Sequence, residues 1–474
     1  MRLPHLSWGL RFTRWLSVAA GLGLAAACAV GPDYHRPKLD VAPDYKEAGE
    51  WKPSEPNDAL SRGPWWEIFK DDALNQLEIR IDISNENVKA AAAAYDQARA
   101  LVAQARAGFW PTVGASAGQQ RGAVGTAPAH TTTSAGISGN WALDIWGQIR
   151  RTVESERESA RASAAALAAA RLSAQALLAT DYFELRAQDQ LQKLLDDTVV
   201  AEQLSLKIAE SRYRFGVAAR ADVVSAEAQL LSSQAQQVNA KIQRAVLEHA
   251  IAVLIGQQPA SFSVSPSSMR ADVPTVPAGI PSALLERRPD VAEAERRVAA
   301  ANAQIGVAKS AFFPSLTLSG SDDYTGRTWS RLFNVPNRIW SLGPSLAETL
   351  FDGGLRSAQV AQARATYDVS VDNYRQTVLT GFEQVEDDIV TLRVLEQQAV
   401  IEDAAVAAAR EAEKLTLNQY KAGTVPYSSV ITAQTTRLSA EQTALAVLSS
   451  RLQSSVALIE AVGGGWNASQ LPLP

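Results

Sequence analysis

The chain has 474 residues, of which 46% are hydrophobic and 20% charged, with one Cys, two Met and four His. This hydrophobic content is typical of a folded protein and argues against disorder. A single Cys excludes an internal disulfide framework, a thiolate zinc cluster and a Cys-x-x-Cys redox pair. The 45 basic and 50 acidic residues give a net charge of −5, which argues against nucleic acid as a partner.

Residues 1–27 have the pattern of a secretory signal peptide. Three arginines precede an apolar run from Trp15 to Ala27, which is shorter than the roughly 20 residues that a membrane-spanning helix needs. Small residues lead into Cys28, the only Cys, which resembles a bacterial lipoprotein signal whose cysteine is acylated. Ala25 stands where such signals usually carry Leu, so an ordinary signal peptide with an accidental Cys is the alternative. Ala29 rather than Asp after the Cys points, by the same resemblance, to the outer membrane.

The rest of the chain contains two copies of one long unit. The motif FWPT at 109–112 recurs as FFPS at 312–315, and YRFG at 213–216 recurs as YKAG at 420–423, at nearly constant spacing. We therefore expect repeat 1 at 84–255 and repeat 2 at 287–462. A Pro-rich linker at 256–286 joins them, an extension at 28–83 precedes them, and a tail at 463–474 follows.

Both copies predict a helix, a β-hairpin, a long helix and a returning helix. The first helix of repeat 1 begins after Ser84-Asn85, a good N-cap, and its counterpart begins at Pro289, which suits a first helical turn. Hairpins are expected at 112–143 and 315–350, where small and polar residues alternate loosely with apolar ones.

These hairpins have the length of tilted membrane strands. Trp141, Trp146, Trp329 and Trp340 lie near strand ends and could form an interfacial aromatic belt. A soluble hairpin core is the alternative.

The long helices are expected at 149–214 and 355–421, and the returning helices at 221–255 and 427–462. Residues 150–213 contain neither Pro nor Gly and are rich in Ala, so one helix there would be roughly 100 Å long. Such a length implies coiled-coil packing or an elongated helical barrel.

Four strands cannot close a membrane barrel, because open edges in lipid leave backbone groups unsatisfied. The run in the signal is too short for a spanning helix, and no other stretch reaches about 18 continuous apolar residues. A protomer that spans the membrane must therefore do so with strands and must oligomerise. The residues themselves do not fix the number of copies.

Several motifs resemble the TolC-like outer membrane factors of tripartite efflux pumps, in the NodT/OprM-type lipoprotein branch. They are GPDYHRP at 31–37, WWEIF at 65–69, LLERRPDV at 284–291 continuing through AANAQIGVA at 300–308, and GGGW at 463–466. The resemblance covers 28–466. It implies a mainly α protein that forms a homotrimer, with a 12-stranded β-barrel in the outer membrane and an α-helical barrel in the periplasm. It also implies a periplasmic adaptor protein and an inner-membrane pump of the RND type as partners.

The same resemblance places the periplasmic tips, where the duct closes and the adaptor docks, at Gly216 and Gly423. Asp222, with Arg220 beside it, occupies the position of an acidic constriction ring. Ser429 and Thr432 stand at the corresponding positions of repeat 2, so that ring is reduced. Closure by the side chains of Tyr213, Tyr420 and Tyr427 is the resulting hypothesis, and a plain helix cap is the alternative role for Asp222.

No other residues suggest chemistry, so we expect no enzyme activity, cofactor or metal. The histidines are far apart, and the acidic run Glu383, Glu386, Asp387 and Asp388 is interpreted as a solvated helix face or lumen lining. The leading function is a passive exit duct for small toxic compounds or drugs. A channel for type I protein secretion and a non-conducting coiled-coil envelope lipoprotein are the alternatives.

Overall fold

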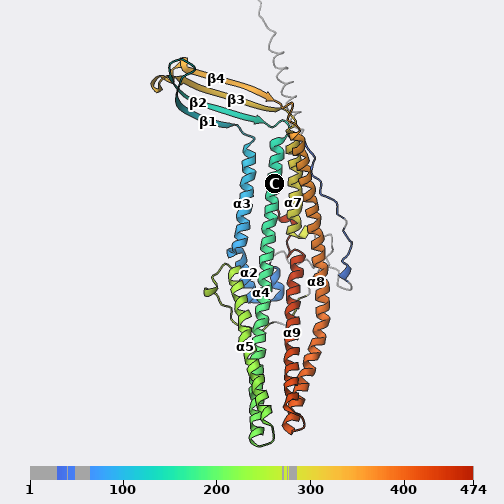
Figure 1. The fold of residues 1–474 in the computed structure, drawn as a ribbon. Coiled ribbons are helices and arrows are strands. Elements are labelled where there is room, and N and C mark those ends of the chain that lie inside the picture. Colours follow the sequence, from blue (N-terminus) through green and yellow to red (C-terminus); the bar gives the residue numbers. More distant parts are fainter. Residues whose placement is uncertain are drawn as a thin grey trace, which may run out of the picture.

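The computed structural model describes residues 29–39, 41–48, 64–269, 272–274, 276 and 286–472. Cys28 and the expected signal peptide lie outside these residues. Long helices run side by side along one axis, and a four-stranded sheet extends from one end of them (Figure 1). The element order α3–β1–β2–α4–α5 recurs as α7–β3–β4–α8–α9, as the duplicated motifs predict.

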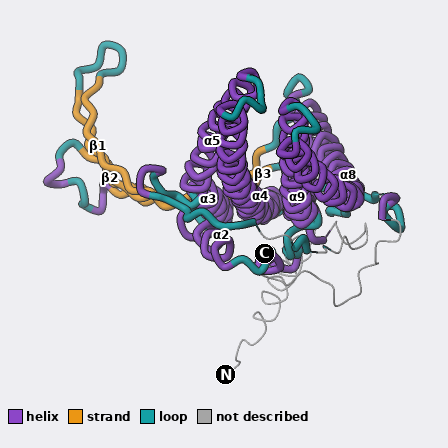
Figure 2. The backbone as a smooth tube through the Cα atoms, turned by 90° about the horizontal axis from the view of Figure 1, so that it is seen from below, coloured by secondary structure: helices purple, strands orange, loops and turns teal. Residues whose placement is uncertain are grey.

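Next to the sheet, four helices pack in the order α3, α4, α7 and α8. They are α3 (Glu86–Ala107), α4 (Gln148–Arg214), α7 (Pro289–Ser310) and α8 (Leu355–Ala422). Towards the other end, α5 (Arg220–Leu254) returns along α4, and α9 (Tyr427–Ala461) returns along α8. Figure 2 shows these two helix pairs end-on. The long helices of 67 and 68 residues lie within one residue of their predicted bounds.

An aspartate holds the first turn of each long helix. Asp144 accepts hydrogen bonds from the backbone N–H groups of Ile149 and Arg150 at 2.9 and 3.0 Å, and pairs with the Arg150 guanidinium. Asp352 does the same for Arg356 in repeat 2, with an Oδ2–Nε distance of 2.6 Å. A carboxylate at a helix N-terminus satisfies free N–H groups and complements the helix dipole. The strand-to-helix junction is therefore built in the same way twice.

The sheet joins the two repeats. Its strands are β1 (Thr112–Gly122), β2 (His130–Leu143), β3 (Ser315–Gly326) and β4 (Arg338–Ala347), in the order β1-β2-β3-β4, all antiparallel. Both hairpins form, and β2 of repeat 1 pairs with β3 of repeat 2 from Thr133 to Leu143. The outer edges of β1 and β4 have no strand partner within this sheet.

The strand register gives the sheet one apolar and one polar face. Side chains alternate between faces, so directly paired residues share a face. Ile137 pairs with Asp322, which pairs with Trp340, and the residues two positions along continue this face. The mainly apolar face carries Val113, Ala115, Ala117, Ala135, Ile137, Trp141, Leu143, Leu316, Leu318, Trp340, Leu342 and Leu346, together with the polar or charged Gln119, Arg121, Thr131, Thr133, Asp322, Tyr324 and Arg338. The mainly polar face carries Thr112, Ser116, Gln120, Thr132, Ser134, Ser138, Asn140, Ser315, Thr317, Ser319, Ser321, Thr325, Ser341 and Ser345, together with His130, Asp323, Ala142, Ile339 and Ala347.

Only part of the predicted tryptophan belt faces outwards. Trp340 is exposed on the apolar face, and Trp141 lies on that face with its indole N–H bonded to the Phe109 carbonyl at 2.9 Å. Trp146 instead stacks on Phe313 at 4.8 Å and donates to the carbonyl of Pro314. The belt prediction is wrong for Trp146, which fastens the strand-to-helix junction of repeat 1 to the helix-to-strand junction of repeat 2, between α7 and β3.

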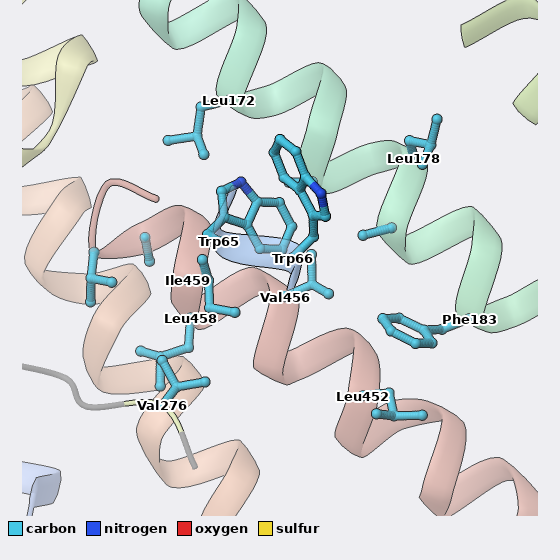
Figure 3. Close-up of a cluster of buried hydrophobic side chains, with 14 of the residues drawn as sticks. Trp65, Trp66, Leu172, Leu178, Phe183, Val276, Leu452, Val456, Leu458 and Ile459 are labelled. Carbon is cyan, nitrogen blue, oxygen red and sulfur yellow. The ribbon is translucent and has the colours of Figure 1, made fainter. Parts of the chain in front are cut away.

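The main hydrophobic core lies about half-way along the helices. The 3-10 helix Trp65–Phe69 and α2 (Asp72–Ser84) bring Trp65, Trp66 and Phe69 against α4 and α9. Figure 3 shows both tryptophans among Leu172, Phe183 and Ile459. This small region binds the N-terminal extension to both repeats.

The N-terminal segment 29–39 forms a strap against α4 and α7. Val30 N–H donates to the Trp146 carbonyl at 3.0 Å, and Arg151 pairs with Asp33 at 2.9 Å. A Cβ on Gly306 would lie 2.8 Å from Arg151 Cγ and 2.9 Å from the Val30 carbonyl oxygen. The absence of a side chain on α7 at this point is what lets the strap lie so close.

Among the described residues, α4 alone meets the length and composition expected of a membrane-spanning helix, with an 18-residue window of mean hydropathy 1.3 that is 44% buried. Core helices meet the same criteria. Because α4 packs against α3, α5, α7 and α9, we assign its apolar character to packing within the bundle.

Candidate functional site

The two helix turns far from the sheet hold most of the predicted gate residues. Gly216 has φ of +71° in the turn from α4 to α5, and Gly423 has φ of +79° in the turn from α8 to α9. L-residues with side chains rarely adopt this conformation, so glycine is required where each helix reverses.

A small cluster of buried side chains joins the two turns. Tyr420 and Tyr427 are 2% and 1% exposed, and their rings meet edge to face at 5.1 Å. They pack with Ala209 of α4 and Ala226 of α5, so that all four helices contribute. The turns of the two repeats are thus one packed unit within the protomer.

Asp222 belongs to this cluster. The Tyr420 hydroxyl donates to Asp222 Oδ2 at 3.4 Å, which is a long hydrogen bond. Burial, followed by the Asp222 charge, raises the pKa of Tyr420. Burial likewise raises the pKa of Tyr427 to about 12. Both phenols are therefore neutral at physiological pH.

Arg212 is a second link between the repeats that sequence reasoning missed. Its guanidinium lies 4.8 Å from the centre of the Tyr420 ring, within the range of a cation–π contact. Its Nη1 donates to the backbone carbonyl of Lys421 at 2.7 Å. Nothing in the sequence distinguishes Arg212 from Arg214, which is exposed, because helix rotation decides which of them faces α8.

The structure does not support the capping role for Asp222. The N-cap of α5 is Ala219, without a side-chain hydrogen bond, and Asp222 is the third residue of the helix. It still lies in the first turn, where a carboxylate complements the helix dipole. Its counterpart in α9 is Ser429, as the repeat spacing predicts.

Two other predicted gate residues lie outside the cluster. Tyr213 is 46% exposed, and Arg220 is exposed at the start of α5. In addition, Phe215 and Val217 are exposed beside Gly216, whereas Lys421 and Thr424 flank the other turn. One turn of each protomer is therefore apolar and the other polar, a contrast visible in the motifs but not considered from the sequence.

A buried polar layer lies next to the cluster. Arg437 of α9 pairs with Glu413 of α8 and with Glu441 of its own helix. Glu202 of α4 is 2% exposed and accepts from Gln229 at 3.0 Å, and burial raises its pKa. A paired polar layer between long helices favours one helix register over others.

The acidic run on α8 is more than a solvated face. Glu386 accepts hydrogen bonds from the backbone N–H groups of Lys46 and Glu47 at 2.7 and 2.9 Å, so it holds the N-terminal extension. Asp388 lines a cavity of about 520 Å³ with Asp387 and Glu460. Burial, then the Asp387 charge, raises the pKa of Asp388 to about 7.

Within the described part of the chain, no three or more His, Cys, Asp or Glu side chains are grouped to hold a metal ion. The interactions observed at the helix turns are apolar packing, hydrogen bonds and a cation–π contact.

Comparison with known proteins agrees with this architecture. The sequence profile of outer membrane efflux proteins matches residues 80–257 and 280–464, which is most of the chain. The chain belongs to the outer membrane efflux protein family.

Individual members of the family are similar over nearly their full length. The toluene efflux pump outer membrane protein TtgC of Pseudomonas putida is 29% identical, with 95% of each chain covered. The pyoverdine export outer membrane protein OpmQ of Pseudomonas aeruginosa is 30% identical, over 87% of this chain and 90% of the relative.

Solved structures show the same fold. The outer-membrane channel OprN is 31% identical with a TM-score of 0.85, covering 93% of this chain and all of the other. The open-state MtrE channel of Neisseria gonorrhoeae is 25% identical with a TM-score of 0.81, covering 93% and 99%. This family member is thus an outer membrane efflux component, with strands in the membrane and helices extending into the periplasm.

Proposed function

We propose that this efflux protein is a passive exit duct formed by three copies of the chain, through which small toxic compounds leave the periplasm. The open edges of the sheet carry this proposal. Three four-stranded sheets joined through β1 and β4 would give twelve strands and leave no unpaired edge in lipid. The apolar face would then meet lipid and the polar face would line water.

Exposed apolar stripes on the helices support assembly with further copies of the chain. Val224, Leu231 and Val238 are exposed at seven-residue intervals on α5. Val394, Ile401 and Leu415 are exposed at multiples of seven on α8. This spacing is typical of a helix that packs lengthwise against another, and stripes of this kind seldom remain open to water. Next to the sheet, α3 and α8 are the outermost helices of the order α3–α4–α7–α8. In the proposed assembly, α3 of one copy would therefore meet α8 of the next.

The helix turns serve as the closed end of the duct in this proposal. Tyr420, Asp222 and Arg212 hold the two helix pairs of a protomer together, so their separation would widen the passage. The exposed apolar turn at Phe215 and Val217 is suited to binding the tip of a periplasmic adaptor protein. The names of relatives favour small organic cargo over secreted protein, and an inner-membrane pump of the RND type would supply the energy. The duct itself needs no catalytic site or cofactor.

The lipid anchor at Cys28 is part of the same proposal. Ala29 lies against Gly147 at the start of α4, where a Cβ would come within 2.9 Å of Ala29. Acyl chains on the preceding residue would therefore enter the membrane at the junction of strands and helices.

Deletion and complementation test the cellular role. Loss of the gene should lower tolerance to solvents, dyes or antibiotics, and the wild-type chain should restore it. A variant with Phe215→Asp and Val217→Asp should reach the outer membrane as a trimer but fail to restore tolerance. Normal tolerance in the deletion strain under every compound tested, with no other duct expressed, would contradict the proposal.

A further inference from the structure

The polar face of the sheet carries a single charged side chain. Among the acidic and basic residues of the four strands, Arg121, Asp322 and Arg338 fall on the apolar face. Asp323 alone falls on the polar face, and His130 at the strand end is the other titratable group there. The remaining side chains of that face are mostly hydroxyls and amides.

Asp322 and Asp323 are adjacent in sequence but differ in their surroundings. The carboxylate of Asp322 is bound by Arg338 through two hydrogen bonds of 2.8 Å each. Asp323 makes no hydrogen bond or ion pair with the described residues of the protomer. Its direct partners across the strands are Gly136 and Ile339.

Gly136 leaves the space that the Asp323 carboxylate occupies. A Cβ built on Gly136 would lie 1.8 Å from Asp323 Oδ1. The carboxylate therefore lies over the glycine, flat across the polar face, instead of bonding to a side chain. Nearby on this face, the hydroxyls of Ser321 and Ser341 bond to each other at 3.1 Å and not to Asp323.

We infer that Asp323 sets the ion preference of the membrane barrel, and this inference rests on the proposed three-copy duct. Three copies place three uncompensated carboxylates on one level of the lumen. Fixed charges of one sign on the wall of a water-filled pore raise the local concentration of the opposite ion. The barrel favours cations, and positively charged cargo passes it more readily than negatively charged cargo of similar size. Gly136 is a positioning residue, because it sets where the carboxylate lies.

Reversal potentials in planar bilayers test this inference. All channels carry the opened tip, Asp222→Ala with Tyr420→Phe, so that the helix turns do not dominate the measurement. In a KCl gradient, Asp323→Asn should lower the K⁺/Cl⁻ permeability ratio by about twofold or more, and Asp323→Arg should reverse the preference. Asp322→Asn, the matched control on the apolar face, should leave the ratio unchanged. If the trimers conduct but have the same K⁺/Cl⁻ permeability ratio with and without the Asp323 carboxylate, the inference about Asp323 is overturned and the proposed duct is not.

Thiol labelling tests the orientation independently of conductance. The sequence contains only Cys28, which is acylated if the proposed anchor is correct. In trimers held in lipid vesicles, Asp323→Cys should react with a charged, membrane-impermeant thiol reagent, and Asp322→Cys should react at least about tenfold more slowly because lipid covers it. The opposite order would overturn the assignment of the faces. Absence of conductance in every variant would overturn the duct itself, and the inference with it.

Discussion

The hydroxyl of Tyr420 donates to Asp222 Oδ2 at 3.4 Å, across 198 residues of sequence. This contact joins α8 of repeat 2 to α5 of repeat 1 at the end of the molecule farthest from the sheet. The duplicated units therefore meet at the helix turns as well as through β2 and β3 and along α4, which packs against α7 and α9.

Removal of this contact should loosen the closed end of the duct. We expect Tyr420→Phe combined with Asp222→Ala to raise single-channel conductance, because the pair removes a hydrogen bond to a charged group, worth at most about 1.5 kcal/mol at this length. Tyr213→Phe is the matched control, since Tyr213 is exposed and lies outside the cluster. Unchanged conductance in the double variant would show that these residues do not hold the turns together.

Replacement of Arg212 should also loosen the closed end of the duct, through a different contact. Arg212→Ala removes the cation–π contact with Tyr420 and the hydrogen bond to the Lys421 carbonyl, together worth about 1–3 kcal/mol. We expect larger conductance and faster protease cleavage at the turns, whereas Arg214→Ala on the exposed side should behave like wild type. If both arginines behave alike, the contact is not part of the closed state.

Glu78 should make stability depend on pH. It is fully buried in α2, both carboxylate oxygens lack a hydrogen-bond partner among the described residues, and burial raises its pKa to about 9. The folded state therefore keeps a proton that the unfolded chain loses above its usual value of 4.5. The free energy of unfolding should therefore fall as the pH rises from about 4.5 to about 9, by at most about 1.4 kcal/mol per pH unit.

The check is the heat-dissociation midpoint of the trimer from pH 5 to pH 9. Glu78→Gln should flatten the decline and raise the midpoint at pH 8 more than at pH 5. A parallel decline in both proteins would mean that other groups, such as Asp388, cause it.

Gly306 should be needed for the N-terminal strap. Gly306→Ala places a methyl group against Arg151 and the Val30 carbonyl, at a cost of about 1–3 kcal/mol. We expect a lower trimer yield and faster proteolysis before residue 40. Gly118→Ala, where an added Cβ meets nothing within 4 Å, is the control. Equal trimer yield and equal proteolysis in the two variants would argue against a fixed strap.

The backbone could be predicted well because its signals are local. The Asn85 cap is observed, with its side chain accepting from the Val88 N–H at 3.0 Å. Glycines that end the long helices and the change of periodicity after Pro111 and Pro314 also depend on neighbouring residues only. Because the two repeats share these motifs, the same elements could be predicted in both.

The contacts of the site could not be predicted in the same way. Which side of α4 faces α8 decides between Arg212 and Arg214, and this depends on how long helices rotate against each other. The aromatic character of Trp146 suggested a membrane belt, but its stacking on Phe313 depends on how the repeats pair. The interpretation of Glu386 as solvated likewise overlooked its bonds to Lys46 and Glu47 of the N-terminal extension, which is distant in sequence.

Single-channel recording from trimers purified from outer membranes tests the central claim most directly. We expect a particle of three chains that conducts in a planar bilayer and conducts more when Tyr420 and Asp222 are replaced. A non-conducting monomer, or a stable trimer that never conducts even with both residues replaced, would contradict it.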